Sequence, residues 1–220
     1  MVVASQPLVE CHPGSEGLAP LYALPVADTK QTKTIGEHWV ASELARRGWA
    51  PALTRDGIER TDILAVHTGL ERHLIEVQVK SIRGDSPRSS WPLGLKAQQP
   101  PRSQHEWFIF TAIPDNHRLP VRGFVVPRAH VAAAAWITHW HWITEPGIAA
   151  GKRNTTVDRS RVPLKTFAAY EGRWDLLEAP ADAAPILLPA DFHGYALESR
   201  VGLPDGHPWR QSMPDPWRVE

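Results

Sequence analysis

Polar and apolar side chains alternate along residues 75–80, whose sequence is IEVQVK. Successive side chains of a β-strand point to opposite faces, so Glu76, Gln78 and Lys80 share one face. A carboxylate, an amide and an ammonium on a half-buried strand are costly to desolvate unless each has a partner. A divalent metal ion and a phosphate group would supply such partners.

Asp62 stands before the apolar residues 63–66, and the pattern predicts two strands, 62–68 and 73–82, joined by a turn around Gly69. Opposite residues of an antiparallel pair share a face. Asp62 therefore faces the side of Gln78 and Lys80 if the connection has an odd number of residues or if a bulge intervenes. Mg²⁺ binds through one or two carboxylates with water and phosphate oxygens, and a nearby lysine can orient water or stabilise charge. These residue types suit phosphodiester hydrolysis.

Glu37 has two readings. It follows Thr34 by three positions, which is the spacing of a capping box at a helix start. Apolar residues continue at helical spacing as far as Gly48, and they place Glu37 on the face that packs on the sheet. A carboxylate there needs a partner, and the metal site is one candidate.

The remaining pattern predicts a small mixed β-sheet flanked by helices, an α/β fold. After the strand pair comes a long loop, 84–105, rich in Pro, Ser and Gly, a feature that is unusual unless the loop is functional. Further strands are expected at 107–113 and 123–126, and helices at 130–142 and 164–177. We divide the chain into an irregular N-terminal arm (1–28), an α/β domain (29–178) and a Pro-rich C-terminal extension (179–220) that wraps the surface or is partly disordered.

Composition limits the partners. The formal net charge is zero, so an anionic partner must be held locally. The basic residues that follow the 75–80 strand are the candidates for phosphate contacts, and Trp91 among them either stacks on a base or anchors the loop. These candidate nucleic-acid contacts are Arg83, Arg88, Trp91, Lys96 and Arg102.

One cysteine, Cys11, excludes an internal disulfide framework, and the lack of a long apolar run favours a cytoplasmic protein without a membrane span.

The ordered set of Glu37 on a helix, Asp62 at a strand head and Gln78-Val79-Lys80 on the next strand resembles the PD-(D/E)xK nuclease superfamily. Glutamine at the second acidic position is similar to the Mrr-like restriction endonucleases. The resemblance covers about residues 34–127 and implies a restriction-endonuclease-like core.

The resemblance implies Asp62, Gln78, Lys80 and Glu37 as catalytic residues. The metal, Mg²⁺ or Mn²⁺, would be held by Asp62, by Gln78 or the carbonyl of Val79, and with help from Glu76. The expected activity is a DNA endonuclease, and many such enzymes act as homodimers. Two alternatives stay open: a catalytically inactive relative that binds nucleic acid, favoured by Gln78 and the zero net charge, and a protein-interaction module that uses the tryptophan-rich second half.

Overall fold

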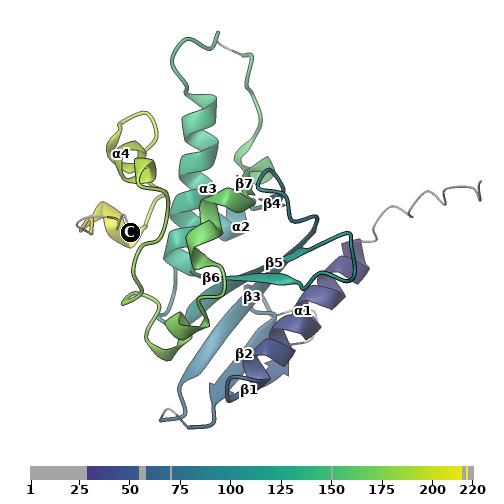
Figure 1. Ribbon diagram of the computed structural model, residues 1–220. Coiled ribbons are helices and arrows are strands. Elements are labelled where there is room, and N and C mark those ends of the chain that lie inside the picture. The colour runs from purple at the N-terminus through teal and green to yellow at the C-terminus, as the bar shows by residue number, and fades with distance from the viewer. Residues whose placement is uncertain (1–28, 55–57, 70, 150, 215–216, 218–220) are drawn as a thin grey trace, which may run out of the picture.

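The computed structural model describes the chain except residues 1–28, 55–57, 70, 150, 215–216 and 218–220. The fold is mixed α/β, with a five-stranded mixed sheet in the order β1-β2-β3-β5-β6 (Figure 1). The expected N-terminal arm lies outside the described residues. The sheet strands are β1 (Trp49–Leu53), β2 (Ile63–His67), β3 (Leu74–Arg83), β5 (Glu106–Ile113) and β6 (Arg122–Pro127).

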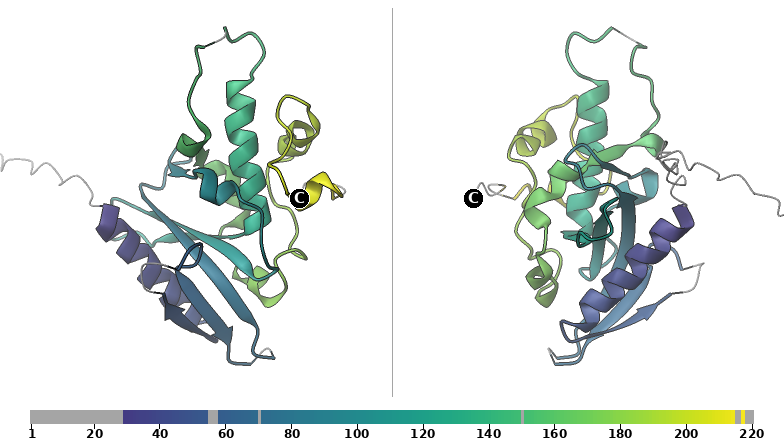
Figure 2. Two further views of the ribbon diagram at one scale, coloured as in Figure 1. Left: turned by 180° about the vertical axis from the view of Figure 1, so that it is seen from behind. Right: turned by 45° about the vertical axis from the view of Figure 1, so that its right-hand side comes forward.

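The first helix, α1 (Thr29–Ala45), crosses one face of the sheet (Figure 2). Its buried positions are Thr32, Gly36, Val40 and Leu44, four residues apart, so one narrow stripe of the helix contacts the strands. Gly36 brings the helix close to the sheet. The helix begins five residues before Thr34, so the predicted capping box is wrong, because Thr34 lies inside the helix rather than at its N-cap.

The predicted strand pair is confirmed. β2 and β3 are antiparallel, with Ile63 opposite Val77 and the amide of His67 bonded to the carbonyl of His73. Residues 68–72 therefore form the connection, an odd number of residues. The regular register ends at Ile63, because the amide of Asp62 also bonds the carbonyl of Val77, so the pairing is irregular where Asp62 precedes β2.

The sheet's first strand, β1, was not predicted. Pro51 lies in its middle, and proline inside a short run argues against a central strand. Among the described residues β1 pairs with β2 alone and so forms an edge of the sheet, where a proline that lacks an N–H donor is accepted.

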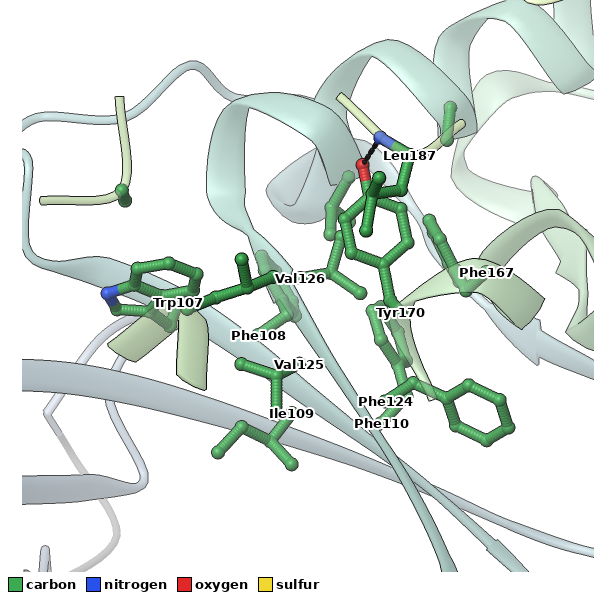
Figure 3. Packing of buried hydrophobic residues seen from close by; sticks show 14 of the residues in the cluster. Trp107, Phe108, Ile109, Phe110, Phe124, Val125, Val126, Phe167, Tyr170 and Leu187 are labelled. Atoms are coloured by element: carbon green, nitrogen blue, oxygen red, sulfur yellow. Dashed lines mark hydrogen bonds between the residues drawn. The ribbon is translucent and has the colours of Figure 1, made fainter. Parts of the chain in front are cut away.

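β5 is the centre of the core. It runs parallel to β3 and antiparallel to β6, and all eight of its residues are buried. Phe108 and Phe110 point to the face opposite α1, where Phe124, Phe167 and Tyr170 complete an aromatic cluster (Figure 3). The hydroxyl of Tyr170 accepts a hydrogen bond from the amide of Leu187, 2.8 Å away (Figure 3). Burial on both faces explains the uninterrupted apolar sequence of this strand.

The second face of the sheet is covered by α3 (Arg128–Ile143) and by pieces of the long loop and of the chain after α3 (Figures 1 and 2). The predicted loop 84–105 is confirmed only in part, because it contains a short strand and one helical turn. The predicted helix at 164–177 is wrong: Gly172, at a φ of 68°, separates two 3-10 segments. These smaller elements are β4 (Ser90–Pro92), α2 (Leu95–Gln98), η1 (Val157–Arg159), β7 (Arg161–Pro163), η2 (Leu164–Tyr170) and η3 (Trp174–Glu178).

The described part of the C-terminal extension wraps the outer side of α3 (Figure 1). It includes α4 (Asp191–Leu197) and the 3-10 turn η4 (Pro208–Arg210). Trp209 and Trp217 are buried, and the ring of His207 bonds the carbonyl of Ala129 on α3. No helix of the described residues is long and apolar enough to cross a membrane.

Candidate active site

Asp62 directly precedes β2, at the point where the β2–β3 pairing stops and β3 continues alone on that side. Its backbone amide bonds the carbonyl of Val77, which is the last link to β3, and its Oδ2 accepts a hydrogen bond of 2.8 Å from the amide of Val79. In an undisturbed ladder Val79 would pair with residue 61. The carboxylate thus takes the place of a backbone acceptor at the point where the two strands separate.

The carbonyl of Val79 faces the same edge. In a strand, the N–H and C=O of one residue point to the same side, because a hydrogen-bonded antiparallel pair exchanges both bonds. Since the amide of Val79 meets Asp62, its carbonyl oxygen also points to the side that β2 has left open. Two of the predicted metal ligands, Asp62 and the Val79 carbonyl, therefore meet at this edge of β3.

Lys80 is half-buried next to this edge, and its ammonium makes no hydrogen bond or ion pair with any of the described residues. Burial lowers the pKa of Lys80, and the nearby charges of Lys33 and Arg128 lower it further. The carboxylates of Asp62 and Glu37 act in the opposite direction. The charges of Asp62 and Glu37 thus offset part of the effect of burial on the Lys80 ammonium.

Glu37 lies on the flank of α1 rather than in its buried stripe, with 18% of its side chain exposed. It pairs with Lys33 one turn earlier, at 3.5 Å, and its charge reaches Lys80. The charges of Glu37 and Asp62 therefore both act on Lys80.

Gln78 points to the same face as Lys80, but its amide oxygen has another partner. It accepts a hydrogen bond of 3.2 Å from Arg128, whose side chain is 1% exposed. Arg128 forms an ion pair with Glu106, which also pairs with Arg60 at 2.6 Å. Burial and the charge of Arg60 lower the pKa of Arg128 to about 10, so the guanidinium is still protonated at neutral pH. A cation beside the amide oxygen opposes metal binding at Gln78.

Glu76 is also engaged elsewhere. Its two carboxylate oxygens accept hydrogen bonds from the hydroxyls of Thr61, at 3.3 Å, and Ser103, at 3.4 Å. These contacts tie the start of β3 to its neighbouring loops. Glu76 has a structural role here that the spacing alone did not indicate.

The predicted nucleic-acid contacts do not form one surface. Arg83 and Arg88 line a pocket beyond the C-terminal end of β3, whereas Arg102 lies just before the start of β5. Lys96 on α2 is exposed and lies 3.8 Å from Glu59. Trp91 is wholly buried: its indole N–H donates to the carbonyl of Thr111, and its ring packs on Phe110 and others. The prediction that Trp91 contacts a base is wrong, and its alternative role as a loop anchor is correct.

The donor set fits a hard cation through few protein ligands. No group of three or more His, Cys, Asp or Glu that could hold a metal occurs among the described residues. Asp62 and the Val79 carbonyl offer one carboxylate and one neutral oxygen, and Mg²⁺ accepts such a set because it keeps several waters and binds substrate phosphate oxygens.

The sequence reading missed the buried network of Arg60, Glu106 and Arg128. Glu106 did carry a signal, because a carboxylate directly before the apolar residues 107–113 is buried with its strand and then needs a cation. Nothing in the sequence pointed to Arg128 as that cation, since it is 22 positions away and joins the site only through the β5–β6 pairing.

The chain was compared with protein-family models, with curated proteins and with solved structures, and none of them matches.

Proposed function

We propose that the protein is a divalent-metal-dependent nuclease whose reaction centre lies at the open edge of β3. The observation that carries this proposal is that Asp62 bonds the Val79 amide where β2 leaves β3, beside Lys80, whose ammonium interacts with the charge of Asp62 and makes no hydrogen bond with any of the described residues. The fold is compatible with it at the level of class: α1 is followed by three antiparallel strands and then by a strand parallel to the third, in one mixed sheet.

Each group has a defined task in this proposal. Asp62 and the Val79 carbonyl hold Mg²⁺ or Mn²⁺, which would acidify water and neutralise charge on the phosphate. The Lys80 ammonium stabilises negative charge that develops on the phosphate oxygens, or orients the attacking water. Glu37 adds negative charge near Lys80 and favours its protonated form.

One observation favours a second candidate, a catalytically inactive relative that binds nucleic acid. The amide of Gln78 is bonded to Arg128, so the position that carries a second carboxylate in the commoner pattern is neutral and faces a cation. A phosphate group could be attracted to such an edge without being cleaved.

Cleavage assays with Lys80 variants test the first candidate. Lys80→Ala and Lys80→Met are expected to abolish Mg²⁺- or Mn²⁺-dependent cleavage of DNA and RNA substrates, whereas Lys152→Ala, at an exposed lysine in the turn after α3, leaves it unchanged. Folding is not expected to suffer. Because burial lowers the pKa of Lys80, the native state disfavours its charge, and the melting temperature of Lys80→Met should equal or exceed that of the wild type. Cleavage that survives in both variants would contradict the assignment.

Metal binding separates the two candidates. Titration of Mn²⁺, followed by calorimetry or by paramagnetic relaxation of water, should show a site that Asp62→Asn weakens about tenfold or more, because the replacement removes the only carboxylate of the proposed donor set. Binding of nucleic acid without any Mn²⁺ site would identify the inactive relative instead.

A further inference from the structure

A second polar site lies on the other face of β3. A pocket of about 490 Å³ opens beside the C-terminal end of this strand, between the first turn of α1 and the β4–β7 pair. Ser81 lines it, and Ser81 points to the α1 face, since a Cβ on Gly36 of that helix would meet its Oγ. Lys80 points to the opposite face because side chains alternate along a strand. The pocket is therefore distinct from the candidate active site.

Three arginines from separate parts of the chain line this pocket: Arg83 at the end of β3, Arg88 in the following loop and Arg161 on β7. None of the described residues that line it is acidic. We call it the arginine pocket. Guanidinium groups that face a shared space repel one another, and no carboxylate of the lining offsets this repulsion. Such a space favours an anion.

Two of the guanidinium groups are held in place. Arg161 donates from Nε to the hydroxyl of Ser90, at 2.9 Å, and from Nη2 to the carbonyl of the same residue, at 2.6 Å. Arg83 donates from Nε to the hydroxyl of Thr32, at 3.4 Å. These bonds occupy only part of each guanidinium, which has five N–H donors in a planar fork. Arg88 is exposed, and its guanidinium makes no hydrogen bond or ion pair with any of the described residues.

The remaining lining suits a phosphoryl group. Hydroxyls of Ser89 and Ser90 can donate to phosphate oxygens, and Thr29 and Thr32 belong to the first turn of the 17-residue helix α1, where the helix dipole is positive. Planar guanidinium groups match phosphate oxygens in pairs. The volume falls within the range of about 300–1,000 Å³ that is typical of small-molecule sites, which leaves room for the sugar or base attached to the phosphate.

We propose that the arginine pocket binds the dianionic phosphoryl group of a phosphomonoester or diphosphate, carried by a nucleic-acid end or by a free nucleotide. An internal phosphodiester has a single negative charge, whereas a phosphomonoester has close to two at neutral pH, a better match for three guanidinium groups. This binding requires neither Asp62 nor Lys80, so it holds whether or not the protein cleaves nucleic acid.

Calorimetric titration of the full chain with inorganic pyrophosphate, in EDTA to remove divalent ions, tests the proposal. The wild type should bind saturably. Arg88→Gln alone should weaken binding, and Arg83→Gln with Arg88→Gln should weaken it about tenfold or more, since charge-assisted hydrogen bonds are lost. The control, Arg72→Gln, changes an arginine in the turn at the opposite end of β3 and should bind as the wild type does.

The source of the phosphoryl group is identified with two oligonucleotides of one sequence, with a 5′-phosphate or a 5′-hydroxyl. A preference for the phosphorylated strand that both arginine variants lose assigns a nucleic-acid end, and pyrophosphate binding without that preference assigns a free nucleotide. Absence of saturable pyrophosphate binding, or equal affinity in the double variant and the wild type, would overturn the proposal. Lys80→Ala should retain pyrophosphate binding, which separates this outcome from failure of the nuclease assignment.

Discussion

Polar side chains that share one face of a single strand have different partners in this protein. Glu76 accepts hydrogen bonds from two hydroxyls, and Gln78 accepts one from a buried guanidinium. Of the charged groups on this face, the Lys80 ammonium makes no hydrogen bond with any of the described residues. Partners come from loops and strands far away in the sequence, so equal spacing along β3 does not mean equal function.

Glu106 balances the two arginines of the buried network, and we predict that Glu106→Gln is strongly destabilising. The side chains of Glu106, Arg60 and Arg128 are between 1% and 8% exposed. Removing the anion leaves two buried cations without a counter-charge, which costs about 3–5 kcal/mol in comparable buried pairs. Urea unfolding measures the change in the free energy of unfolding.

A matched control uses an ion pair at the surface. Glu171 contacts Arg122 at 2.6 Å, but its side chain is 38% exposed. Exposed pairs contribute about 0–1 kcal/mol, so Glu171→Gln should have a small effect. Similar losses in both variants would show that the Glu106 network is not acting as a desolvated ion pair.

At the scale of elements, the contact between α1 and the sheet sets where Glu37 lies. Gly36 sits over Ser81 and Thr111, which are bonded to each other at 2.8 Å. The absence of a side chain at Gly36 lets the helix approach the strands, and this approach carries Glu37 towards the edge at which Asp62 and Lys80 meet. If a side chain at this position held the helix further from the sheet, the charge of Glu37 would lie further from Asp62 and Lys80.

Gly36→Ala is therefore expected to destabilise the protein although alanine is the better helix former. An added Cβ would lie 1.8 Å from the Oγ of Ser81 and 2.9 Å from the Oγ1 of Thr111. Overpacking of this kind costs about 1–3 kcal/mol, against a gain in helix propensity of about 1 kcal/mol. Unfolding in urea gives the net change.

The double variant Gly36→Ala with Ser81→Ala provides the control, because it removes the closest atom. Gly36→Ala should lower the free energy of unfolding less when it is added to Ser81→Ala than when it is added to the wild type. If Gly36→Ala stabilises the protein, the close approach of α1 is not tight enough to determine the position of Glu37.

At the scale of the whole molecule, the C-terminal extension closes the outer side of α3 over two buried histidines. The hydroxyl of Tyr170 accepts a hydrogen bond from the amide of Leu187 and is hydrogen-bonded to Nδ1 of His130, at 2.7 Å. His207 donates from Nε2 to the carbonyl of Ala129 and accepts the amide of Trp209 at Nδ1. A ring nitrogen that accepts an N–H carries no proton, so the His207 ring is neutral. Burial lowers the pKa of His130 to about 3 and that of His207 to about 4.

These histidines predict a loss of stability in mild acid. A histidine of the unfolded chain takes up a proton near pH 6.5, whereas the buried rings stay neutral down to about pH 4. The unfolded state then binds more protons, so the free energy of unfolding falls as the pH decreases below about 6.5. Urea unfolding between pH 7 and pH 5, above most carboxylate titrations, measures the slope.

His207→Gln keeps a donor and an acceptor but removes the titrating ring, and it should flatten this slope. His38→Gln changes an exposed histidine of α1 and should leave the slope as it is. An equal decline in the wild type and in His207→Gln would contradict the role of the buried ring.

The sequence alone determined the local alternation and its consequences. Short apolar runs specified β2, β5 and β6 to within one or two residues, and period-two alternation specified β3 and put Glu76, Gln78 and Lys80 on one face. The sequence pattern predicted secondary structure less well where contacts with other elements determine it. Pro51 argued against a strand at β1, which is an edge strand. The apolar spacing at 164–177 predicted one helix, but the structure has two 3-10 segments separated by Gly172.

Only the tertiary structure decided which members of the candidate site have other partners. Where β2 separates from β3, Asp62 bonds the amide of Val79; the packing of α1 lets the charge of Glu37 act on Lys80; and the β5–β6 pairing places Arg128 on Gln78. It also gathered Arg83, Arg88 and Arg161 into one pocket. The physical reason is that spacing along a strand fixes the direction of a side chain, whereas its charge environment depends on groups that only chain folding brings together.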